Sequence, residues 1–543
     1  MTQTPSVRFP IRAFIMVLMV AVITRVFIVA SNSVSFHSDE AVVSLMARHI
    51  LQGARPTFFY GQAYMGSLDA WLNALGFAVF GESVGSIRII QSALYLGTVA
   101  SGMALAWRLT TRRSALITTG LMLAIPSVLL TTYTTATLGG YGETLLLGNI
   151  LMLLGLTVVD VKRRAGINWF ALGLVAGIGW WTNALIAVYA LPVAIMIVVS
   201  WVKRANGAVG ATQWIAHIRQ TTAHVLIAVG GFVIGAAPWW IFALQNEFAP
   251  LAFLTGGGEN SGFAGTDIFT LPFDQRVIGY VLIGLPTLIG LRFPWSPAYF
   301  IPVIGVPLFV GVIFGVVQGV RRARWDGRWL FGSFLVTFSV VFLASRFSFD
   351  PTGRYFLPLA VPVAVLFGAL ISTLTEHRRW IGIVVISLLV GYQAAGLITT
   401  ATTQPGFTTQ FNLDTHIANT DDAALIAFLD DHALYNGYTQ YWIAFRLAFL
   451  SGERMQYSAT LPYLPSLKYT PLDERYPPYR AAADGTDRIA LIIAETTPNL
   501  APIRAGLEGM LAARAITYTV SQIGVYRVYY DFTPTSPRPP FEL

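Results

Sequence analysis

The chain has 543 residues, of which 55% are hydrophobic and only 11% carry a charged side chain. Soluble globular proteins contain about 25% charged residues, so the composition excludes an ordinary soluble protein and predicts a polytopic membrane protein. The formal net charge of +8 comes from short Lys and Arg clusters between apolar runs, which argues against nucleic acid as a partner and is typical of membrane topology. The chain contains no cysteine, which excludes disulfide bonds and thiol chemistry.

Eleven apolar stretches approach the roughly 20 residues that a transmembrane helix needs. We interpret the first as a retained span, because it has no convincing small-residue cleavage site. The fifth and sixth together are short for two crossings and require a tight turn at Asn183. The stretches lie near residues 11–30, 84–107, 115–131, 143–160, 169–182, 184–202, 222–244, 297–320, 329–345, 355–373 and 380–399.

Basic clusters in every second loop predict the orientation, because short cytoplasmic loops are enriched in Lys and Arg. This alternation places the amino terminus in the cytoplasm and, after about eleven spans, the carboxyl terminus outside. A further segment, 276–292, is apolar enough to cross, but the alternation favours its lying in or dipping into the outer interface. The clusters are Arg8 and Arg12; Arg108, Arg112 and Arg113; Lys162, Arg163 and Arg164; Lys203 and Arg204; Arg321, Arg322, Arg324 and Arg328; and Arg378 and Arg379.

The sequence predicts two domains, a transmembrane module over residues 1–400 and an extracytoplasmic domain over 401–543. In the first outer loop, apolar residues at helical spacing predict two amphipathic helices, 38–52 and 65–80, along the membrane surface. The last 140 or so residues alternate helical and strand patterns, which predicts a small α/β domain with a proline-rich end. Its expected elements are helices at 421–432, 440–449 and 500–514, and strands at 435–438, 488–494 and twice near 516–530.

The notable ionisable residues gather at the outer ends of the spans, whereas an ion-coupled transporter is expected to keep such groups near the midplane. Asp39 and Glu40 are adjacent at the start of the first predicted outer helix. They are explained as acids that the helix dipole favours, or as a catalytic pair in which Asp39 is a general base. Glu143 opens the fourth span after several glycines. It is either a simple interfacial carboxylate, or it joins Asp39 to orient an acceptor or to bind Mg²⁺ or Mn²⁺.

Arg354 and Tyr355 begin the tenth span at its outer end. Arg and Tyr are common membrane anchors at this position. In the alternative interpretation, Arg354 pairs with a phosphate leaving group and Tyr355 donates a hydrogen bond to it. Arg88, near the outer end of the second span, is a further candidate for phosphate binding.

Several of these features together resemble the GT-C glycosyltransferases, and within them the branch of the protein O-mannosyltransferases and lipid A aminoarabinose transferases. The resemblance covers residues 10–375 in organisation. It implies an inverting transfer of a sugar from a polyprenyl-phosphate donor to a lipid, glycan or protein acceptor on the non-cytoplasmic face. The features are the acidic pair in the first outer loop, its continuation GQAYMGSLDAW, the acid before the fourth span, GWWTN, RYFLP and the α/β tail.

The motifs shared with the family imply roles for single residues of this chain. By resemblance, Asp39 takes the position of the catalytic acid and Glu40 that of its neighbour. Glu143 takes the second acidic position, which joins a metal site in some members. Arg354 falls where a ligand of the donor phosphate is expected.

One stretch departs from the pattern of the aminoarabinose transferases. They carry a lysine after the acidic pair, where this chain has Gly61, Gln62, Ala63 and Tyr64. The departure argues against lipid A as the acceptor, and it makes Gln62 and Tyr64 candidates for neutral contacts with the donor. The glycine-rich loop at 245–275 is expected to order over the donor.

Two other classes of function stay open on the sequence. A glycosyltransferase needs an apolar groove between spans for the lipid of its donor, and a flippase or transporter of a lipid-linked saccharide would use the same groove. A non-catalytic scaffold for envelope assembly would rely on the carboxyl-terminal domain.

Overall fold

The computed structural model describes residues 8–160, 165–205, 211–255, 272–345 and 350–541. Among them, eight helices are long and apolar enough to cross a membrane, or ten if each of two sharply bent pairs is one span. The chain is therefore a multi-pass membrane protein, as its composition predicts. The eight are α1 (Ile11–Ala30), α4 (Val84–Thr110), α7 (Tyr141–Val159), α9 (Ala187–Ala205) with η2 (Ala184–Ile186), α15 (Pro302–Arg322), α16 (Trp325–Ala344), α17 (Ala360–His377) with η6 (Arg354–Leu359), and α18 (Arg379–Thr402).

The other predicted spans are bent or short. α5 (Arg113–Ala124) meets α6 (Val128–Thr135) at 68°, and residues 219–235 of α10 (Ala211–Gly235) meet α11 (Ala237–Gln245) at 64°. With α8 (Gly166–Thr182), which has 17 residues, these helices lie at the eleven apolar stretches of the sequence. The predicted helical membrane fold is confirmed.

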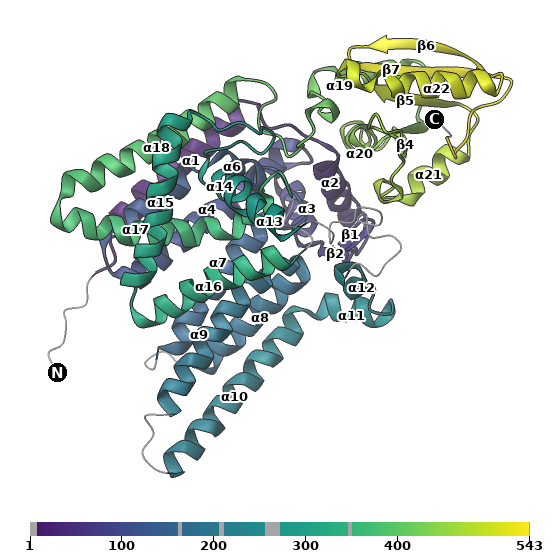
Figure 1. Cartoon of the computed structure of the whole chain (residues 1–543). Helices are drawn as coiled ribbons and strands as arrows, with labels where there is room; N and C mark the ends of the chain where they lie inside the picture. Colours follow the sequence, from purple (N-terminus) through teal and green to yellow (C-terminus); the bar gives the residue numbers. More distant parts are fainter. Residues whose placement is uncertain (1–7, 161–164, 206–210, 256–271, 346–349, 542–543) are drawn as a thin grey trace.

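Helices α8 and α10 pack backbone against backbone because glycines line both of them. A Cβ atom added at Gly173 would lie 1.8 Å from the carbonyl oxygen of Ala228, and one at Gly177 would lie 2.3 Å from that of Phe232. Small residues four apart allow this close approach, which is common between helices in membranes. The close pairing holds together the arm of helices that extends away from the rest of the molecule in Figure 1.

The basic loops lie together at one end of the helices. Arg108, at the end of α4, pairs with Asp160 after α7, with 3.0 Å between Nη2 and Oδ2. Arg112 pairs with Glu376, near the end of α17, at 2.9 Å. The loops that carry basic clusters in the sequence therefore lie on one side of the structure.

The loops predicted to be external meet at the other end. Ser35 N donates to the carbonyl oxygen of Phe407 at 3.1 Å, and Asn73 Nδ2 donates to Thr137 Oγ1 at 3.0 Å. Segment 276–292 stays at this end, since Arg292 Nη1 donates to the carbonyl oxygen of Pro351 at 2.7 Å. It is divided into short helices: α13 (Phe273–Ile278), η4 (Gly279–Gly284) and α14 (Leu285–Ile289).

The first outer loop contains α2 (Ser38–Leu51), a hairpin of β1 (Phe58–Phe59) and β2 (Gln62–Gly66), and α3 (Leu68–Phe80). Both predicted helices are present, but the hairpin replaces the start expected for the second one. α2 is buried on all sides over most of its length because the carboxyl-terminal domain covers the face turned away from α3. α3 keeps apolar side chains exposed, among them Leu75 and Val79. The predicted glycine-rich loop, 245–275, contains the short helix α12 (Ala249–Thr255), and its residues 256–271 lie outside the described residues.

The carboxyl-terminal domain is the predicted small α/β domain, with a five-stranded sheet in the order β4-β3-β5-β7-β6. β3, β4 and β5 are parallel, and β7 and β6 complete the sheet as an antiparallel pair. The sequence did not reveal β4 or α21. The elements are α19 (Asp422–Asp431), β3 (Asn436–Gln440), α20 (Tyr441–Leu450), β4 (Gln456–Leu461), α21 (Pro477–Asp484), β5 (Ile489–Ala494), α22 (Ala501–Ala513), β6 (Thr517–Ile523) and β7 (Tyr526–Thr533).

This domain is docked on the first outer loop, and α20 lies beside α2 in Figure 1. Apolar residues of the two helices, including Met46 and Phe445, belong to one buried cluster. Polar contacts surround it: Arg48 Nη1 and His49 Nε2 lie 3.3 and 2.9 Å from the carboxylate of Glu453. The two predicted domains therefore share a core at their junction.

Candidate active site

A cavity of about 710 Å³ lies where the span ends that are predicted to be external meet the carboxyl-terminal domain. One wall is apolar and comes from membrane helices, with Val188 on α9 and Phe338 and Phe342 on α16. Another wall is polar and comes from the carboxyl-terminal domain. Five of the residues singled out in the sequence line the cavity: Asp39, Gln62, Tyr64, Arg354 and Tyr355.

Asp39 is in the first turn of α2, at the edge of the cavity. The hydroxyl of Tyr441, the first residue of α20, donates a hydrogen bond to Asp39 Oδ1. Burial, together with the charge of Asp39, raises the pKa of Tyr441. The phenol therefore stays protonated and orients the carboxylate of Asp39, whose other oxygen remains available for chemistry.

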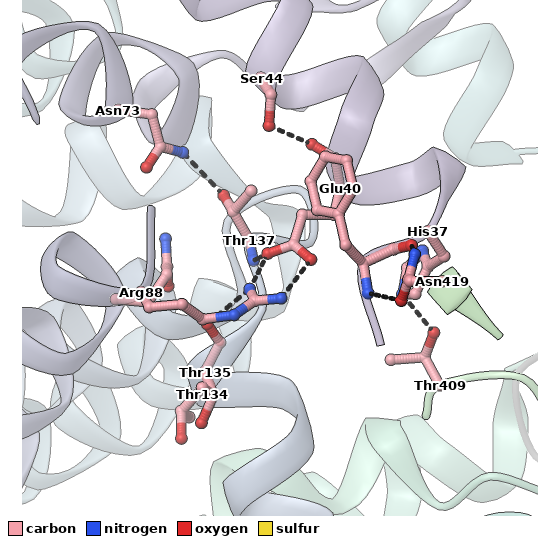
Figure 2. A network of polar contacts seen from close by, with 12 residues as sticks. His37, Glu40, Ser44, Asn73, Arg88, Thr134, Thr135, Thr137, Thr409 and Asn419 are labelled. Atoms are coloured by element: carbon pink, nitrogen blue, oxygen red, sulfur yellow. Dashed lines mark hydrogen bonds and ion pairs between the residues drawn. The ribbon is translucent and has the colours of Figure 1, made fainter. Parts of the chain in front are cut away.

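Glu40 does not line the cavity, and its carboxylate points towards Arg88 and Thr137 (Figure 2). Its carboxylate forms a two-pronged ion pair with Arg88, in which Nη2 and Oε2 are 2.9 Å apart. The backbone N–H of Thr137 donates to Oε1 at 3.1 Å. Glu40 and Arg88 are 0% and 4% exposed. Because each neutralises the other, this pair joins α2 to α4 and leaves neither charge facing the cavity.

Glu143 is also buried away from the cavity, in the first turn of α7. Gln91 Nε2 donates to Glu143 Oε1 at a long 3.5 Å. The carboxylate of Asp69, on α3, is close enough for its charge to act on the carboxylate of Glu143. The Asp69 carboxylate accepts from backbone N–H groups, including that of Ala70 at 2.8 Å. Glu143 is thus brought to Asp69 and not to the cavity surface beside Asp39.

Arg354 and Tyr355 begin η6 at the opposite side of the cavity. Arg354 Nε lies 2.7 Å from Asp350 Oδ2, and its guanidinium carbon is 5.1 Å from the centre of the Tyr355 ring. The side chain of Arg354 is 38% exposed. The ion pair fixes its direction while its other N–H groups remain able to bind an anion.

The β1–β2 hairpin brings Gln62 and Tyr64 to the cavity between these two sides. Burial raises the pKa of Tyr64, against the opposing effects of Arg354 and Arg475, and the charge of Asp39 raises it further. All three charged groups are thus close enough to act on the Tyr64 hydroxyl, which stays protonated. The hairpin itself rests on the GWWTN motif, since a Cβ atom at Gly66 would lie 2.2 Å from the carbonyl oxygen of Trp181.

The carboxyl-terminal domain supplies residues that could not be singled out from the sequence: Asp473 and Arg475 line the cavity, and Tyr441 binds Asp39 at its edge. Burial raises the pKa of Asp473 to about 7, against the effect of Arg475 and with a further contribution from Asp39. Trp442 and Tyr463 add aromatic rings to the same wall. The run TPLDERYPPYR, rich in charges and tyrosines but without helical or strand periodicity, was the one available signal.

The donor set near Asp39 does not fit a divalent cation. Within the described residues, no group of three or more His, Cys, Asp or Glu side chains is arranged to hold a metal ion. The groups shown near Asp39 are a phenol, Tyr441, a guanidinium, Arg475, and one further carboxylate, Asp473, whereas hard cations require several oxygen ligands. The predicted metal site of Asp39 and Glu143 is not formed by these two residues.

With its membrane helices, first outer loop and appended α/β domain, the chain has the fold of the GT-C glycosyltransferases. The crystal structure of ArnT from Cupriavidus metallidurans bound to undecaprenyl phosphate matches it with a TM-score of 0.56 and 12% sequence identity, covering 96% of this chain and 99% of that one. The apo oligosaccharyltransferase of Archaeoglobus fulgidus matches with a TM-score of 0.47 and 11% identity, covering 81% of this chain and 63% of that one. No family model and no curated protein sequence matches the chain.

Proposed function

We propose that this protein is an inverting glycosyltransferase that moves a sugar from a polyprenyl-phosphate donor to an acceptor. The observation that carries the proposal is that a carboxylate, Asp39, and a cation, Arg354, face one cavity with an apolar wall of membrane helices. Such a cavity suits a substrate with a lipid chain, a phosphate and a sugar. Undecaprenyl phosphate bound to ArnT, which has the same fold, supports a donor of this class.

In this mechanism Asp39 takes the proton from the acceptor hydroxyl or amine while that atom attacks the anomeric carbon of the sugar. The bond between that carbon and the phosphate oxygen breaks, and its electron pair stays on the phosphate. The sugar configuration inverts because attack and departure occur on opposite faces. Placement and charge compensation lower the barrier for a leaving group of this kind.

We assign the donor phosphate to Arg354 and Tyr355, and neutral donor contacts to Gln62 and Tyr64. Glu40, Arg88 and Glu143 do not line the cavity, so we give them supporting roles and not contact with substrate. Asp39 has a guanidinium, a phenol and only one further carboxylate, Asp473, near it, so we route no step through a metal and expect transfer to persist in a chelator.

The orientation follows from the two sets of loops. We propose that the basic end, with the amino terminus, is cytoplasmic and that the cavity and the carboxyl-terminal domain are extracytoplasmic. Membrane lipids then surround the exposed apolar side chains of helices such as α1. The acceptor, whether lipid, glycan or protein, reaches the cavity from the side of the carboxyl-terminal domain.

An Asp39→Asn variant tests the proposal. We expect it to bind undecaprenyl phosphate as the wild type does, but to release polyprenyl phosphate from a lipid-linked sugar about 10²–10⁴ times more slowly, the range of general base catalysis. Asp487→Asn is the control, since that side chain is fully exposed. Normal turnover by the Asp39 variant would remove Asp39 from the base role.

The same assay separates the rival functions. A flippase would move the lipid-linked sugar across liposome membranes without releasing polyprenyl phosphate. A scaffold would keep its cellular role after loss of both Asp39 and Glu143.

A further inference from the structure

We propose that Arg475 of the carboxyl-terminal domain is a second cationic ligand of the donor phosphate, so that this domain completes the donor site. The inference rests on the proposed function. Within the described part of the chain, the cavity is lined by two arginines, Arg354 and Arg475, and by no lysine. The first comes from the membrane module and the second from the loop between β4 and α21.

The two arginines differ in how their charges are balanced. Arg354 forms an ion pair with Asp350 at 2.7 Å. Arg475 forms none among the described residues, although it hydrogen-bonds to Tyr441 and the charges of Asp39 and Asp473 act on it from a greater distance. With the Gln62 amide oxygen turned towards it, that neutral oxygen lies 2.6 and 2.8 Å from Nη1 and Nη2 of Arg475. The buried Nε of Arg475, like that of Arg354, has no hydrogen-bond partner within the described chain. Arg475 therefore retains both charge and donor capacity for an anion.

The first outer loop holds Arg475 firmly in place. Gly61 has a φ of +72°, and a Cβ atom there would lie 3.2 Å from Cδ and 3.3 Å from Cα of Arg475. The residue after Arg475, Tyr476, stacks on Tyr60, with ring centres 5.0 Å apart and ring planes 25° apart. Gly61 thus lets the hairpin turn close against the arginine. The hairpin and Arg475 form one unit at the cavity, and a preorganised cation loses little freedom on binding.

The reaction creates a need for such a cation. A sugar linked to polyprenyl phosphate is a phosphodiester with one negative charge, and the leaving polyprenyl phosphate carries a second. In the same step Asp39, whose charge acts on Arg475, accepts a proton and becomes neutral. Arg475 then loses an opposing charge as the phosphate gains one. Arg354 cannot supply this compensation alone, since Asp350 remains paired with it.

Binding of undecaprenyl phosphate and of undecaprenol to the full-length protein in nanodiscs tests the proposal without knowledge of the sugar. We expect Arg475→Gln to raise the Kd for undecaprenyl phosphate about tenfold or more, given the strength of charge-assisted hydrogen bonds, and to leave the Kd for undecaprenol unchanged. Arg475→Lys should show an intermediate loss, because lysine keeps the charge without the planar fork. Arg480→Gln is the control, since Arg480 pairs with Asp484 on α21 and lies outside the cavity lining.

The outcomes are distinct. If the wild type prefers the phosphate and Arg475→Gln binds it within twofold of the wild type, Arg475 is not a phosphate ligand, although the proposed function stands. If the wild type does not distinguish undecaprenyl phosphate from undecaprenol, the proposed donor class fails and this inference fails with it. If Arg475→Gln does not fold, as judged by its thermal midpoint, Arg475→Lys decides, and an unchanged Kd for that variant overturns the assignment.

Discussion

Breaking the Glu40–Arg88 ion pair tests whether Glu40 is structural or catalytic. In the structure its carboxylate is 0% exposed and is bound by Arg88 and by the backbone N–H of Thr137. A Glu40→Leu substitution removes these hydrogen bonds and leaves the Arg88 charge buried without its partner. Arg88→Leu leaves the Glu40 carboxylate buried without its cationic partner.

The magnitude follows from the burial of both groups. Removing one partner of a buried ion pair destabilises a protein by about 3–5 kcal/mol, so independent effects would sum to about 6–10 kcal/mol. The Glu40→Leu/Arg88→Leu double variant buries no unpaired charge. Its main remaining loss is the Thr137 N–H without an acceptor, about 1–3 kcal/mol. We therefore expect the double variant to be more stable than either single variant.

Equilibrium unfolding in mixed micelles, followed by intrinsic tryptophan fluorescence, measures these free energies. Two results would refute the reasoning: single variants that cost less than about 1 kcal/mol, far below the range for a broken buried pair, or a double variant that costs the full sum. Glu40→Gln adds a functional comparison. If that variant kept wild-type stability but lost turnover, Glu40 would be catalytic after all.

Three further predictions follow from single contacts. Tyr441→Phe removes the hydrogen bond to Asp39; we expect a lower kcat for transfer, an unchanged KM for the donor and an unchanged thermal midpoint. Asp473 has a folded-state pKa of about 7, well above the usual value near 3.9, so its ionisation costs stability as pH rises through 7. We expect the wild type to lose thermal stability relative to Asp473→Asn between pH 5 and pH 8. Gly177→Leu forces α8 away from Phe232 of α10; we expect a loss of about 2 kcal/mol or more, measured by unfolding in micelles.

Controls make these comparisons specific. Tyr457 is a fully buried tyrosine of the same domain whose hydroxyl donates to the carbonyl oxygen of Leu434, so Tyr457→Phe should leave kcat unchanged. A stability difference between Asp473→Asn and wild type that does not vary with pH would contradict the raised pKa. Gly230 has no atom within 4 Å of an added Cβ, so Gly230→Ala should leave stability near that of the wild type.

Much of the fold could be predicted because it depends on local composition. Apolar length located the spans, and the alternation of basic loops predicted which loops share a side, as the pairing of Arg108 with Asp160 confirms. The same argument predicts that segment 276–292 does not cross the membrane, and this stays a prediction. The β1–β2 hairpin was missed because its strands are too short for their alternation to be distinct from the helix pattern that follows.

The surroundings of the candidate site could not be predicted from spacing. Asp39 and Glu40 are adjacent and chemically alike, yet one faces the cavity and the other faces Arg88. Successive helical residues point about 100° apart, and only the packing of α2 between α3 and α20 decides which direction is inward. Arg475 lies far from the first outer loop in sequence, so only the tertiary fold reveals its contact with Gln62.

The hydrogen bond from Tyr441 to Asp39 spans 402 residues of sequence, which has a consequence for biosynthesis. The first outer loop emerges early, when its acidic residue has no partner to orient it. The phenol arrives only after the last membrane helix, α18, has been made and the tail has folded against α2. Activity should therefore switch on once per molecule, at the end of assembly, and nascent or prematurely terminated chains should leave the lipid-linked sugar pool untouched.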